Sequence, residues 1–501
     1  MLIHDLLENA ARRWPTKVAL IAGERRLTYR ELDGAADRLA HGLVDRGVEA
    51  GDRIAIQLDN NADAVTALFA AVKAGAVFVM INPGTRPGKL TTLLRDSGAR
   101  VLIASEKTAA PAAHLLSELP RPPTVIRTGP ELDDLRAPSG AAVTGPPPGR
   151  RAGEGDLAAL LYTSGTTGDA KGVMLTHGNV VSAIASIVSY LGLVHDDVLL
   201  DVLPLSFGYG LTQLFSAFQV GAQLVLERGM VFPTITLRRI ADEKVTRWGI
   251  VPTIAAVLLA MDLGRHDLSS LRTITNAGAA LPDDHLRRLR AALPRVDLVC
   301  MYGQTECLRI SYLDPAQVDA RLGSVGKGMP NQDLTVVDED GREVGPGEVG
   351  ELVVSGPHVM RGYWQRPQES ARKLRPGRVP GHTTLITGDL FRRDAEGFLY
   401  FVARKDDIIK CKGEKVSPRE VENVLQALPG VVEAAVVGAQ DAVLGQAVRA
   451  VVVLASGARL SARDVQRHCA DHLEDFMVPS AVEFRDSLPK NENGKIIKKD
   501  L

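Results

Sequence analysis

Residues 161–173 read Leu-Tyr-Thr-Ser-Gly-Thr-Thr-Gly-Asp-Ala-Lys-Gly-Val, and they continue the apolar run 157–161. The stretch holds three glycines, four Ser or Thr hydroxyls and one lysine. Glycine lets backbone N–H groups approach an anion closely, and the hydroxyls and the ammonium add further donors. The pattern predicts a buried strand followed by a loop that grips a polyphosphate through Thr163, Ser164, Gly165, Thr166, Thr167, Gly168 and Lys171.

The spacing of the glycines argues against a Walker A loop. Two residues separate Gly165 from Gly168, and Gly172 follows Lys171, whereas the Walker A pattern is G-x-x-x-x-G-K-[ST]. A P-loop kinase or NTPase is therefore a disfavoured alternative. A polar turn between two strands is the plain structural alternative, and it weakens because further matching segments follow downstream.

Length and composition bound the class of protein. The 501 residues exceed what one hydrophobic core holds, so more than one domain is expected. Apolar residues make up 45% and charged residues 24%, which is ordinary globular composition. The net charge of −1 and the 4% of aromatic residues give no basis for nucleic-acid binding.

Cysteine use and the N-terminus indicate a cytoplasmic protein. The N-terminal segment 1–13 has acidic residues inside its apolar pattern, so we expect an amphipathic helix and no signal peptide. No apolar run approaches the length of a membrane span, so an integral membrane protein is not expected. Reduced thiols are expected because no C-x-x-C pair or zinc spacing occurs among Cys300, Cys307, Cys411 and Cys469.

The order of predicted elements indicates an α/β multidomain fold. Helical and strand patterns alternate over 1–125, a Gly/Pro/Arg-rich linker covers 128–155, and alternation resumes at Leu157, with a strand predicted over 198–203. From Asp333 short strands separated by Gly and Asp turns predict a small antiparallel, β-barrel-like module. After Arg404 the pattern becomes a compact α+β unit.

Four further segments carry chemistry. They are Met-Tyr-Gly-Gln-Thr-Glu at 301–306, Thr-Gly-Asp-Leu at 387–390, the charged stretch 404–418 and Pro-Lys-Asn-Glu-Asn-Gly-Lys-Ile at 489–496. Each alone has a plain explanation. In order, Tyr302 could belong to a core, Asp389 could cap a turn, Arg404 could form a surface ion pair and Lys495 could be solvated.

Together and in this order, these motifs closely resemble the adenylate-forming superfamily. That superfamily contains acyl-CoA synthetases, aryl-acid ligases, luciferases and the adenylation domains of peptide synthetases. The resemblance extends from Leu27-Thr-Tyr-Arg-Glu-Leu to Lys495. It implies an N-terminal AMP- and acyl-binding domain over 1–403, a hinge over 404–407 around Asp406, and a small mobile C-terminal domain over 408–501.

The resemblance also implies roles for single residues. Thr305 would contact the α-phosphate, Glu306 would help to hold Mg²⁺ and Asp389 would bind the ribose hydroxyls of ATP. Lys495 would bridge the substrate carboxylate and ATP, and Gly413 would line the tunnel of the thiol after domain rotation. The adenine would lie among Tyr302 and Gly303 on one side and Asn276, Ala277 and Gly278 on the other, with Arg404 near the ribose.

The chemistry agrees with those roles. A carboxylate is a poor electrophile, and its attack on the α-phosphorus of ATP gives an acyl-AMP and pyrophosphate. Both reactants are anions, so the site must supply cations. A thiol of CoA, or of a carrier protein's phosphopantetheine arm as the alternative, then takes the acyl group. A protein that only binds nucleotide is disfavoured because Glu306, Asp389, Arg404 and Lys495 are all present.

The segment Leu203-Pro-Leu-Ser-Phe-Gly-Tyr-Gly-Leu indicates the kind of acid. In peptide-synthetase domains an aspartate that pairs with the substrate ammonium follows the Ser-Phe, and here that position is Gly208. An unpaired buried ammonium is costly, so an α-amino acid is disfavoured. We expect a fatty or other apolar acid in a pocket that includes Phe207, Gly208, Tyr209 and Ala277, with space left by Gly208 and Gly210.

Overall fold

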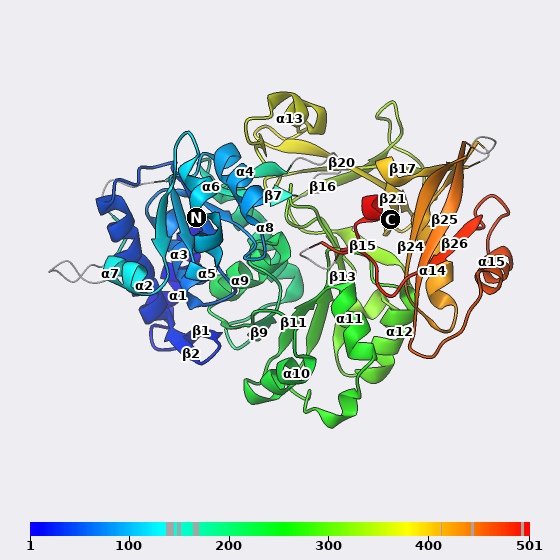
Figure 1. Ribbon diagram of the computed structural model, residues 1–501, viewed down its shortest axis with the longest axis horizontal. Coiled ribbons are helices and arrows are strands. Elements are labelled where there is room, and N and C mark those ends of the chain that lie inside the picture. The colour runs from blue at the N-terminus through cyan, green and yellow to red at the C-terminus, as the bar shows by residue number, and fades with distance from the viewer. Residues whose placement is uncertain (137–144, 148–151, 164–169, 412, 442–444, 492–494) are drawn as a thin grey trace.

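The computed structural model describes residues 1–136, 145–147, 152–163, 170–411, 413–441, 445–491 and 495–501. Within these residues a large N-terminal region contains two sheets, and a smaller C-terminal unit carries a third sheet (Figure 1). The α/β multidomain class predicted from the sequence is therefore confirmed. The predicted phosphate-loop residues Ser164, Gly165, Thr166, Thr167 and Gly168 lie outside the described residues.

The largest sheet has 14 strands and joins a parallel part to an antiparallel part. The parallel part contains β1 (Val18–Ala22), β10 (Gln223–Leu226), β9 (Val198–Asp201), β11 (Arg247–Ile250), β12 (Thr273–Asn276) and β13 (Asp297–Tyr302). The remaining strands are β2 (Arg25–Thr28), β14 (Ser311–Tyr312), β15 (Ser324–Gly328), β16 (Asp333–Val337), β17 (Val349–Gly356), β19 (Leu374–Pro376), β20 (Thr383–Arg393) and β21 (Leu399–Arg404). The antiparallel module predicted from Asp333 onward is thus continuous with the parallel sheet through β15 and β14.

The other two sheets are a seven-stranded sheet that carries the predicted phosphate loop and a five-stranded sheet in the C-terminal unit. The seven-stranded sheet contains the antiparallel pair β7–β8 next to its edge strand β18, and Thr163 lies opposite Lys171 in that pair. Its strands are β3 (Arg53–Gln57), β4 (Val77–Met80), β5 (Val101–Ala104), β6 (Thr124–Arg127), β7 (Leu157–Thr163), β8 (Lys171–Thr176) and β18 (Gly362–Tyr363). The C-terminal sheet contains β22 (Ile409–Cys411), β23 (Glu414–Val416), β24 (Val431–Asp441), β25 (Gly445–Leu454) and β26 (Ala481–Phe484).

Local capping signals set several helix ends. Thr28 and Glu31 form a capping box at the start of α2, with the Glu31 carboxylate accepting a hydrogen bond from Thr28 N at 2.8 Å. The helices are α1 (Ile3–Arg13), α2 (Tyr29–Asp45), α3 (Ala62–Lys73), α4 (Pro87–Ser97), α5 (Glu106–Ala109), α6 (Ala113–Ser117), α7 (Pro130–Arg136), α8 (His177–Leu191), α9 (Gly208–Val220), α10 (Pro233–Asp242), α11 (Pro252–Leu259), α12 (Asp283–Ala292), α13 (Pro367–Lys373), α14 (Pro418–Ala427) and α15 (Ala462–Ala470).

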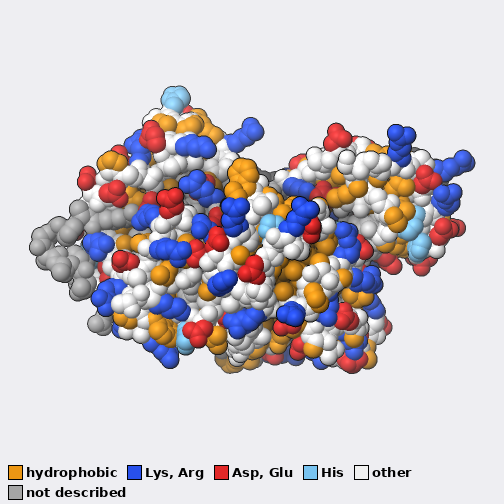
Figure 2. Space-filling view, turned by 90° about the horizontal axis from the view of Figure 1, so that it is seen from below, with side chains coloured by type: hydrophobic (Ala, Val, Ile, Leu, Met, Phe, Trp, Pro, Cys, Tyr) orange, Lys and Arg blue, Asp and Glu red, His pale blue; other side chains and the backbone are white. Residues whose placement is uncertain are grey.

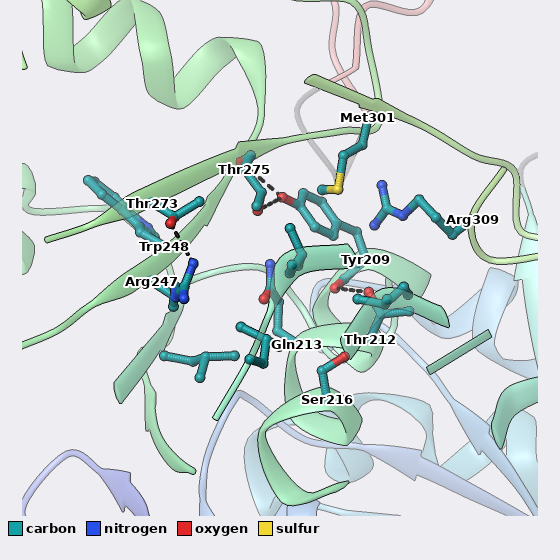
Figure 3. A pocket seen from close by; sticks show the side chains of 14 residues that line it. Tyr209, Thr212, Gln213, Ser216, Arg247, Trp248, Thr273, Thr275, Met301 and Arg309 are labelled. Carbon is teal, nitrogen blue, oxygen red and sulfur yellow. Dashed lines mark hydrogen bonds between the residues drawn. The ribbon is translucent and has the colours of Figure 1, made fainter. Parts of the chain in front are cut away.

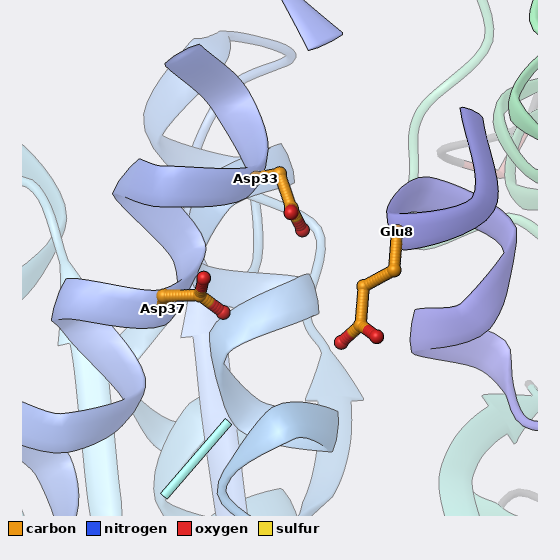
Figure 4. A group of neighbouring side chains, drawn as sticks. All are labelled: Glu8, Asp33 and Asp37. Atoms are coloured by element: carbon orange, nitrogen blue, oxygen red, sulfur yellow. The ribbon is translucent and has the colours of Figure 1, made fainter. Parts of the chain in front are cut away.

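A buried ion cluster ties α1, α2 and α3 together. The carboxylates of Glu8, Asp33 and Asp37 converge between these helices (Figure 4). The Lys73 ammonium donates hydrogen bonds to all three, at 3.0, 2.7 and 2.5 Å respectively. Burial alone would lower the pKa of Lys73, but Asp33 and Asp37 raise it above its ordinary value. The cluster therefore already contains its cation, and it serves to hold the helices in place.

The surface carries charges of both signs. On the face shown in Figure 2, Lys and Arg side chains are interspersed with Asp and Glu side chains, as the net charge of −1 leads one to expect. In the part of the chain that the structure describes, no helix is long and apolar enough to cross a membrane.

Candidate active site

A cavity of about 560 Å³ lies between the N-terminal region and the C-terminal unit. This volume falls within the range of small-molecule sites. Most of the described residues predicted for the site line it: Thr163, Lys171, Phe207, Gly208, Tyr209, Ala277, Gly278, Tyr302, Gly303, Thr305, Glu306, Asp389, Arg404, Asp406 and Lys495. Segments far apart in the sequence are therefore brought to one site.

The carboxyl ends of two neighbouring parallel strands form one wall. The turn after β12 contributes Ala277 and Gly278, and the end of β13 contributes Tyr302 and Gly303. Gly278 has φ +85°, and a Cβ there would lie 3.1 Å from Phe207 Cζ, so the turn requires glycine. Asn276 differs from the expectation: it is buried behind this wall, and its amide donates to the Ala279 carbonyl at 3.1 Å.

Asp389 is the centre of a hydrogen-bonded group. Its Oδ2 accepts from the Tyr302 hydroxyl at 2.6 Å and from Gln304 Nε2 at 2.8 Å. The Arg404 guanidinium, opposite Asp389 in the β20–β21 ladder, lies 3.6 Å from Oδ1. Burial, followed by the Asp389 charge, raises the pKa of Tyr302, so its hydroxyl remains a donor. Sequence reasoning missed Gln304, although it stands inside the quoted motif.

A second group joins Lys171 to Glu306. The Tyr363 hydroxyl donates to Glu306 Oε1 at 2.8 Å, and the Lys171 ammonium lies 5.5 Å above the Tyr363 ring centre. Lys171 also forms an ion pair with Glu369 of α13. Tyr363 reaches this position because β18 pairs with β8, opposite Val173. Neither Tyr363 nor Glu369 belongs to a motif that sequence reasoning found.

Lys495 enters the cavity from the C-terminal unit. Two hydrogen bonds hold its backbone: Asn491 N donates to the Lys495 carbonyl at 2.8 Å, and Lys495 N donates to Asn491 Oδ1 at 2.9 Å. The residue stays exposed to cavity solvent, yet the surrounding protein atoms, and after them Arg404, lower the pKa of its ammonium to about 8. Asp389 opposes this shift.

Polar contacts of the described residues join the C-terminal unit to the N-terminal region beside the cavity. The Ser417 hydroxyl donates to the Val402 carbonyl at 2.7 Å, and the Arg419 guanidinium donates to the Leu281 carbonyl at 3.4 Å. Gly413 lies at the exposed turn between β22 and β23 and is not among the residues that line the cavity. Its predicted contact with a thiol would require the unit to move.

The predicted acyl side of the cavity is only partly as expected. Phe207, Gly208 and Tyr209 line it, and a Cβ at Gly208 would make ordinary contact with Leu308 at 3.5 Å. The space predicted at Gly210 is absent: a Cβ there would lie 2.5 Å from the Pro204 carbonyl oxygen. That prediction is wrong, because this glycine serves close packing of α9 against the preceding turn.

Comparisons with known proteins identify the family of the chain. The model of the AMP-binding enzyme family matches residues 7–364, and that of the AMP-binding enzyme C-terminal domain matches residues 420–495. The chain is similar to a feruloyl-CoA synthase of Amycolatopsis sp, with 37% identity over 98% of this chain and 96% of the relative. It is also similar to a long-chain-fatty-acid–CoA ligase of Bacillus subtilis (strain 168), with 31% identity over 100% of this chain and 94% of the relative.

A solved structure shows the same fold. The anthranilate CoA ligase AuaEII in complex with anthranoyl-AMP superposes with a TM-score of 0.90 and 29% identity, covering 100% of this chain and 96% of that one. The chain therefore belongs to the AMP-binding enzyme family, within the adenylate-forming superfamily. Its activity class is that of an AMP-forming acid–thiol ligase of the acyl- or aryl-CoA ligase type.

Proposed function

We propose that the protein converts a compact carboxylic acid with a largely apolar body to its CoA thioester, using ATP and Mg²⁺. The observation that carries the proposal is the meeting of Lys495 with Lys171, Asp389 and Arg404 around one cavity. Two anions can react there only where cations lie between them, and Lys495, Lys171 and Arg404 supply that positive charge.

In the first step a carboxylate oxygen of the acid attacks the α-phosphorus of ATP. The bond from that phosphorus to the bridging oxygen breaks, and pyrophosphate leaves with the electron pair. Lys495 stabilises the charge between the two reactants, Thr305 contacts the α-phosphate, and Lys171 with residues 163–168 holds the polyphosphate. Asp389 binds the ribose hydroxyls beside Arg404, and Tyr302 contacts the adenine. Little covalent catalysis is needed beyond this positioning.

The donor set around Glu306 fits Mg²⁺. Mg²⁺ in phosphate sites is bound by one or two carboxylates together with phosphate oxygens. Glu306 lines the cavity, and only its Oε1 accepts a hydrogen bond from the residues that the structure describes, which leaves Oε2 for a metal ion. Bound there, the ion would neutralise charge on the phosphates, while the Tyr363 hydroxyl holds the carboxylate in place.

The acyl part of the substrate is proposed to be compact. Tyr209, Met301 and Arg309 lie both on the wall of the main cavity and on that of the chamber behind it. This chamber has a volume of only about 10 Å³, so in this arrangement it has no room for a long chain. An aryl acid or a short acyl acid fits this boundary, and both aromatic and fatty acids occur in the names of the relatives.

In the second step a thiol sulfur attacks the carbonyl carbon of the acyl-AMP, and AMP leaves with the bridging oxygen. We propose CoA as the thiol, with a carrier protein's phosphopantetheine arm as the alternative. The domains are proposed as 1–403, a hinge over 404–407 and 408–501. Rotation about Asp406 would withdraw Lys495 and bring Gly413 to the site, so that one unit serves both steps.

A panel of aryl, short-chain and long-chain acids, scored by pyrophosphate release with and without CoA, tests the function. Release that depends on a compact acid, followed by thioester formation with CoA, is the expected result. Release without any acid, or a long-chain acid as the best substrate by kcat/KM, contradicts the proposal. Thioester formation with a carrier protein but not with CoA selects the alternative acceptor.

Replacing Lys171 should weaken ATP handling. We expect Lys171→Ala to raise the KM for ATP and to slow acyl-AMP formation by about 10-fold or more, because a phosphate charge loses its partner. Steady-state kinetics at varied ATP measures this. Glu369→Gln is the matched control, since it removes the ion-pair partner of the lysine and keeps the ammonium. Unchanged ATP kinetics in Lys171→Ala would show that this loop does not grip the polyphosphate.

Acyl-AMP formation should decline on the alkaline side. Bridging two anions requires the charged ammonium of Lys495, whose pKa is lowered to about 8, so this form is lost as the pH rises through that value. We expect kcat/KM for acyl-AMP formation to fall from about pH 8 upward in a profile from about pH 6.5 to about 9.5, because kcat/KM reports the free enzyme. In Lys495→Arg the guanidinium stays charged over this range, so the decline should move to higher pH or vanish, whatever the absolute rate.

A further inference from the structure

Arg309 is a buried cation whose charge faces an aromatic ring and, among the described residues, no carboxylate. Only 2% of the residue is exposed. Within the described chain its side chain has no hydrogen bond, and no carboxylate lies within the 4.0 Å of an ion pair. Its Nε is sealed from solvent and unpaired. A guanidinium cannot lose its charge in a protein, so leaving it buried and uncompensated is costly.

The backbone is built to place this residue at the cavity. Leu308, directly before it, has φ +61°, a conformation that non-glycine residues seldom adopt. A Cβ at Gly303 would lie 2.6 Å from the Leu308 carbonyl oxygen and 2.9 Å from Arg309 Cα, so only glycine allows this approach. Strain of this kind is retained where the surrounding structure demands a particular geometry, and such positions cluster at functional sites.

Arg309 lines both the main cavity and the small chamber behind it. Figure 3 shows it among the residues that line the chamber. Its guanidinium carbon is 5.0 Å from the centre of the Tyr209 ring, and the Tyr209 hydroxyl is fixed by a 2.9 Å hydrogen bond to the Thr275 carbonyl. The chamber wall carries two more buried polar atoms without partners, Trp248 Nε1 and Ser216 Oγ. Arg and Trp side chains only donate, so this end of the site is suited to an acceptor.

We infer that Arg309 binds an anionic oxygen group at the far end of the acid, so that the preferred substrate carries a second carboxylate. This inference rests on the proposed function and specifies its substrate class. The second carboxylate would offset the buried charge of Arg309. A bidentate, charge-assisted hydrogen bond between the two groups would fix the position of the acyl body. The chamber behind has room for about one water, which could satisfy Trp248 Nε1 and Ser216 Oγ.

Matched acids test the inference. Hexanoate, adipate and monomethyl adipate, and likewise benzoate, terephthalate and monomethyl terephthalate, share a body and differ at the far end. In the unmodified enzyme, kcat/KM for each diacid should exceed that for the monoacid and that for the monomethyl ester of the same series by at least about 10-fold. Arg309→Met should lower kcat/KM for the diacid by about 10- to 100-fold and leave or raise that for the monoacid. Arg309→Lys, which keeps the charge, should recover part of the preference.

The thermal midpoint separates recognition from a structural role. Removing an uncompensated buried cation should leave the midpoint of Arg309→Met unchanged or higher, whereas a structural arginine would lower it together with activity toward every acid. The inference is overturned if the enzyme uses monoacids as well as diacids, or if Arg309→Met affects both alike. In that event pyrophosphate release with the monoacids leaves the proposed function standing. Absence of release with every acid would instead reject the proposed function.

Discussion

Lys495→Ala is expected to slow acyl-AMP formation by roughly 10²-fold or more, the scale of losing one well-placed charge stabiliser. The side chain lines the cavity from the C-terminal unit, and Arg404 and Asp389 line the same cavity. In the proposed mechanism the Lys495 ammonium lies between the carboxylate of the acid and the phosphates of ATP. Without it, the negative charge that develops on the α-phosphate loses a stabilising cation.

The two half-reactions should respond differently to this change. Given preformed acyl-AMP, Lys495→Ala should still make thioester at a rate near that of the unmodified enzyme, because the charge acts before the anhydride exists. Acid-dependent pyrophosphate release measures the first step, and thioester formation from the synthetic adenylate measures the second. Lys499→Ala, at an exposed neighbouring lysine that does not line the cavity, should retain both rates. Equal loss of both steps in Lys495→Ala, with circular dichroism unchanged, would contradict the assigned role.

Local motifs were enough to predict the described wall of the site. Lys171 begins β8, Tyr302 ends β13 and Glu306 stands in the loop that follows it, and strand ends are where ligands are expected. Asp389 instead lies within β20, opposite Arg404, and was predicted from its Thr-Gly-Asp motif alone. Their partners could not be predicted in the same way. Tyr363 reaches Glu306 only because β18 adds to the edge of the seven-stranded sheet, a pairing between distant segments that leaves no local signal.

Glycines show a second limit of sequence reasoning. Gly208 faces the cavity, whereas Gly210 is pressed against the Pro204 carbonyl, although both are one residue type in one short segment. Missing side chains can mean free space or close packing, and only the tertiary contacts distinguish the two. Likewise, the strand predicted over 198–203 ends at Asp201, because Asp201 Oδ1 accepts a hydrogen bond from Leu203 N at 2.9 Å and stabilises a turn.

Arg309 marks a signal that was present and went unused. It stands in the run Cys-Leu-Arg-Ile at 307–310, directly after the predicted phosphate and metal residues. A charge inside an apolar run beside a site motif is unusual, since arginine is seldom fully buried unless paired. Its burial against Tyr209 and its unpaired Nε, however, became evident only from the tertiary packing.

Asp406→Pro should give the opposite result to Lys495→Ala: acyl-AMP still forms, and thioester formation fails. Asp406 lies in η4 (Lys405–Asp407), a 3₁₀ helix of one turn. This turn connects β21 of the large sheet to β22 of the C-terminal sheet. Extended residues flank it, with Arg404 at φ −73°, ψ 142° and Ile408 at φ −61°, ψ 126°. Proline fixes φ near −65°, a value that a 3₁₀ turn accepts, so the present arrangement is retained while rotation about φ is blocked.

Separate assays of the two steps, each compared with Asp406→Ala, decide this prediction. Alanine removes the same carboxylate and leaves φ free, so it should retain both steps if backbone rotation is what matters. A loss of thioester formation by about 10²-fold in the proline variant alone would support alternation of the C-terminal unit between Lys495 and Gly413. Equal losses in the two variants would assign the effect to the carboxylate. Full thioester activity in Asp406→Pro would mean that the transfer step needs no rotation at this residue, and that Gly413 reaches the thiol by another motion or not at all.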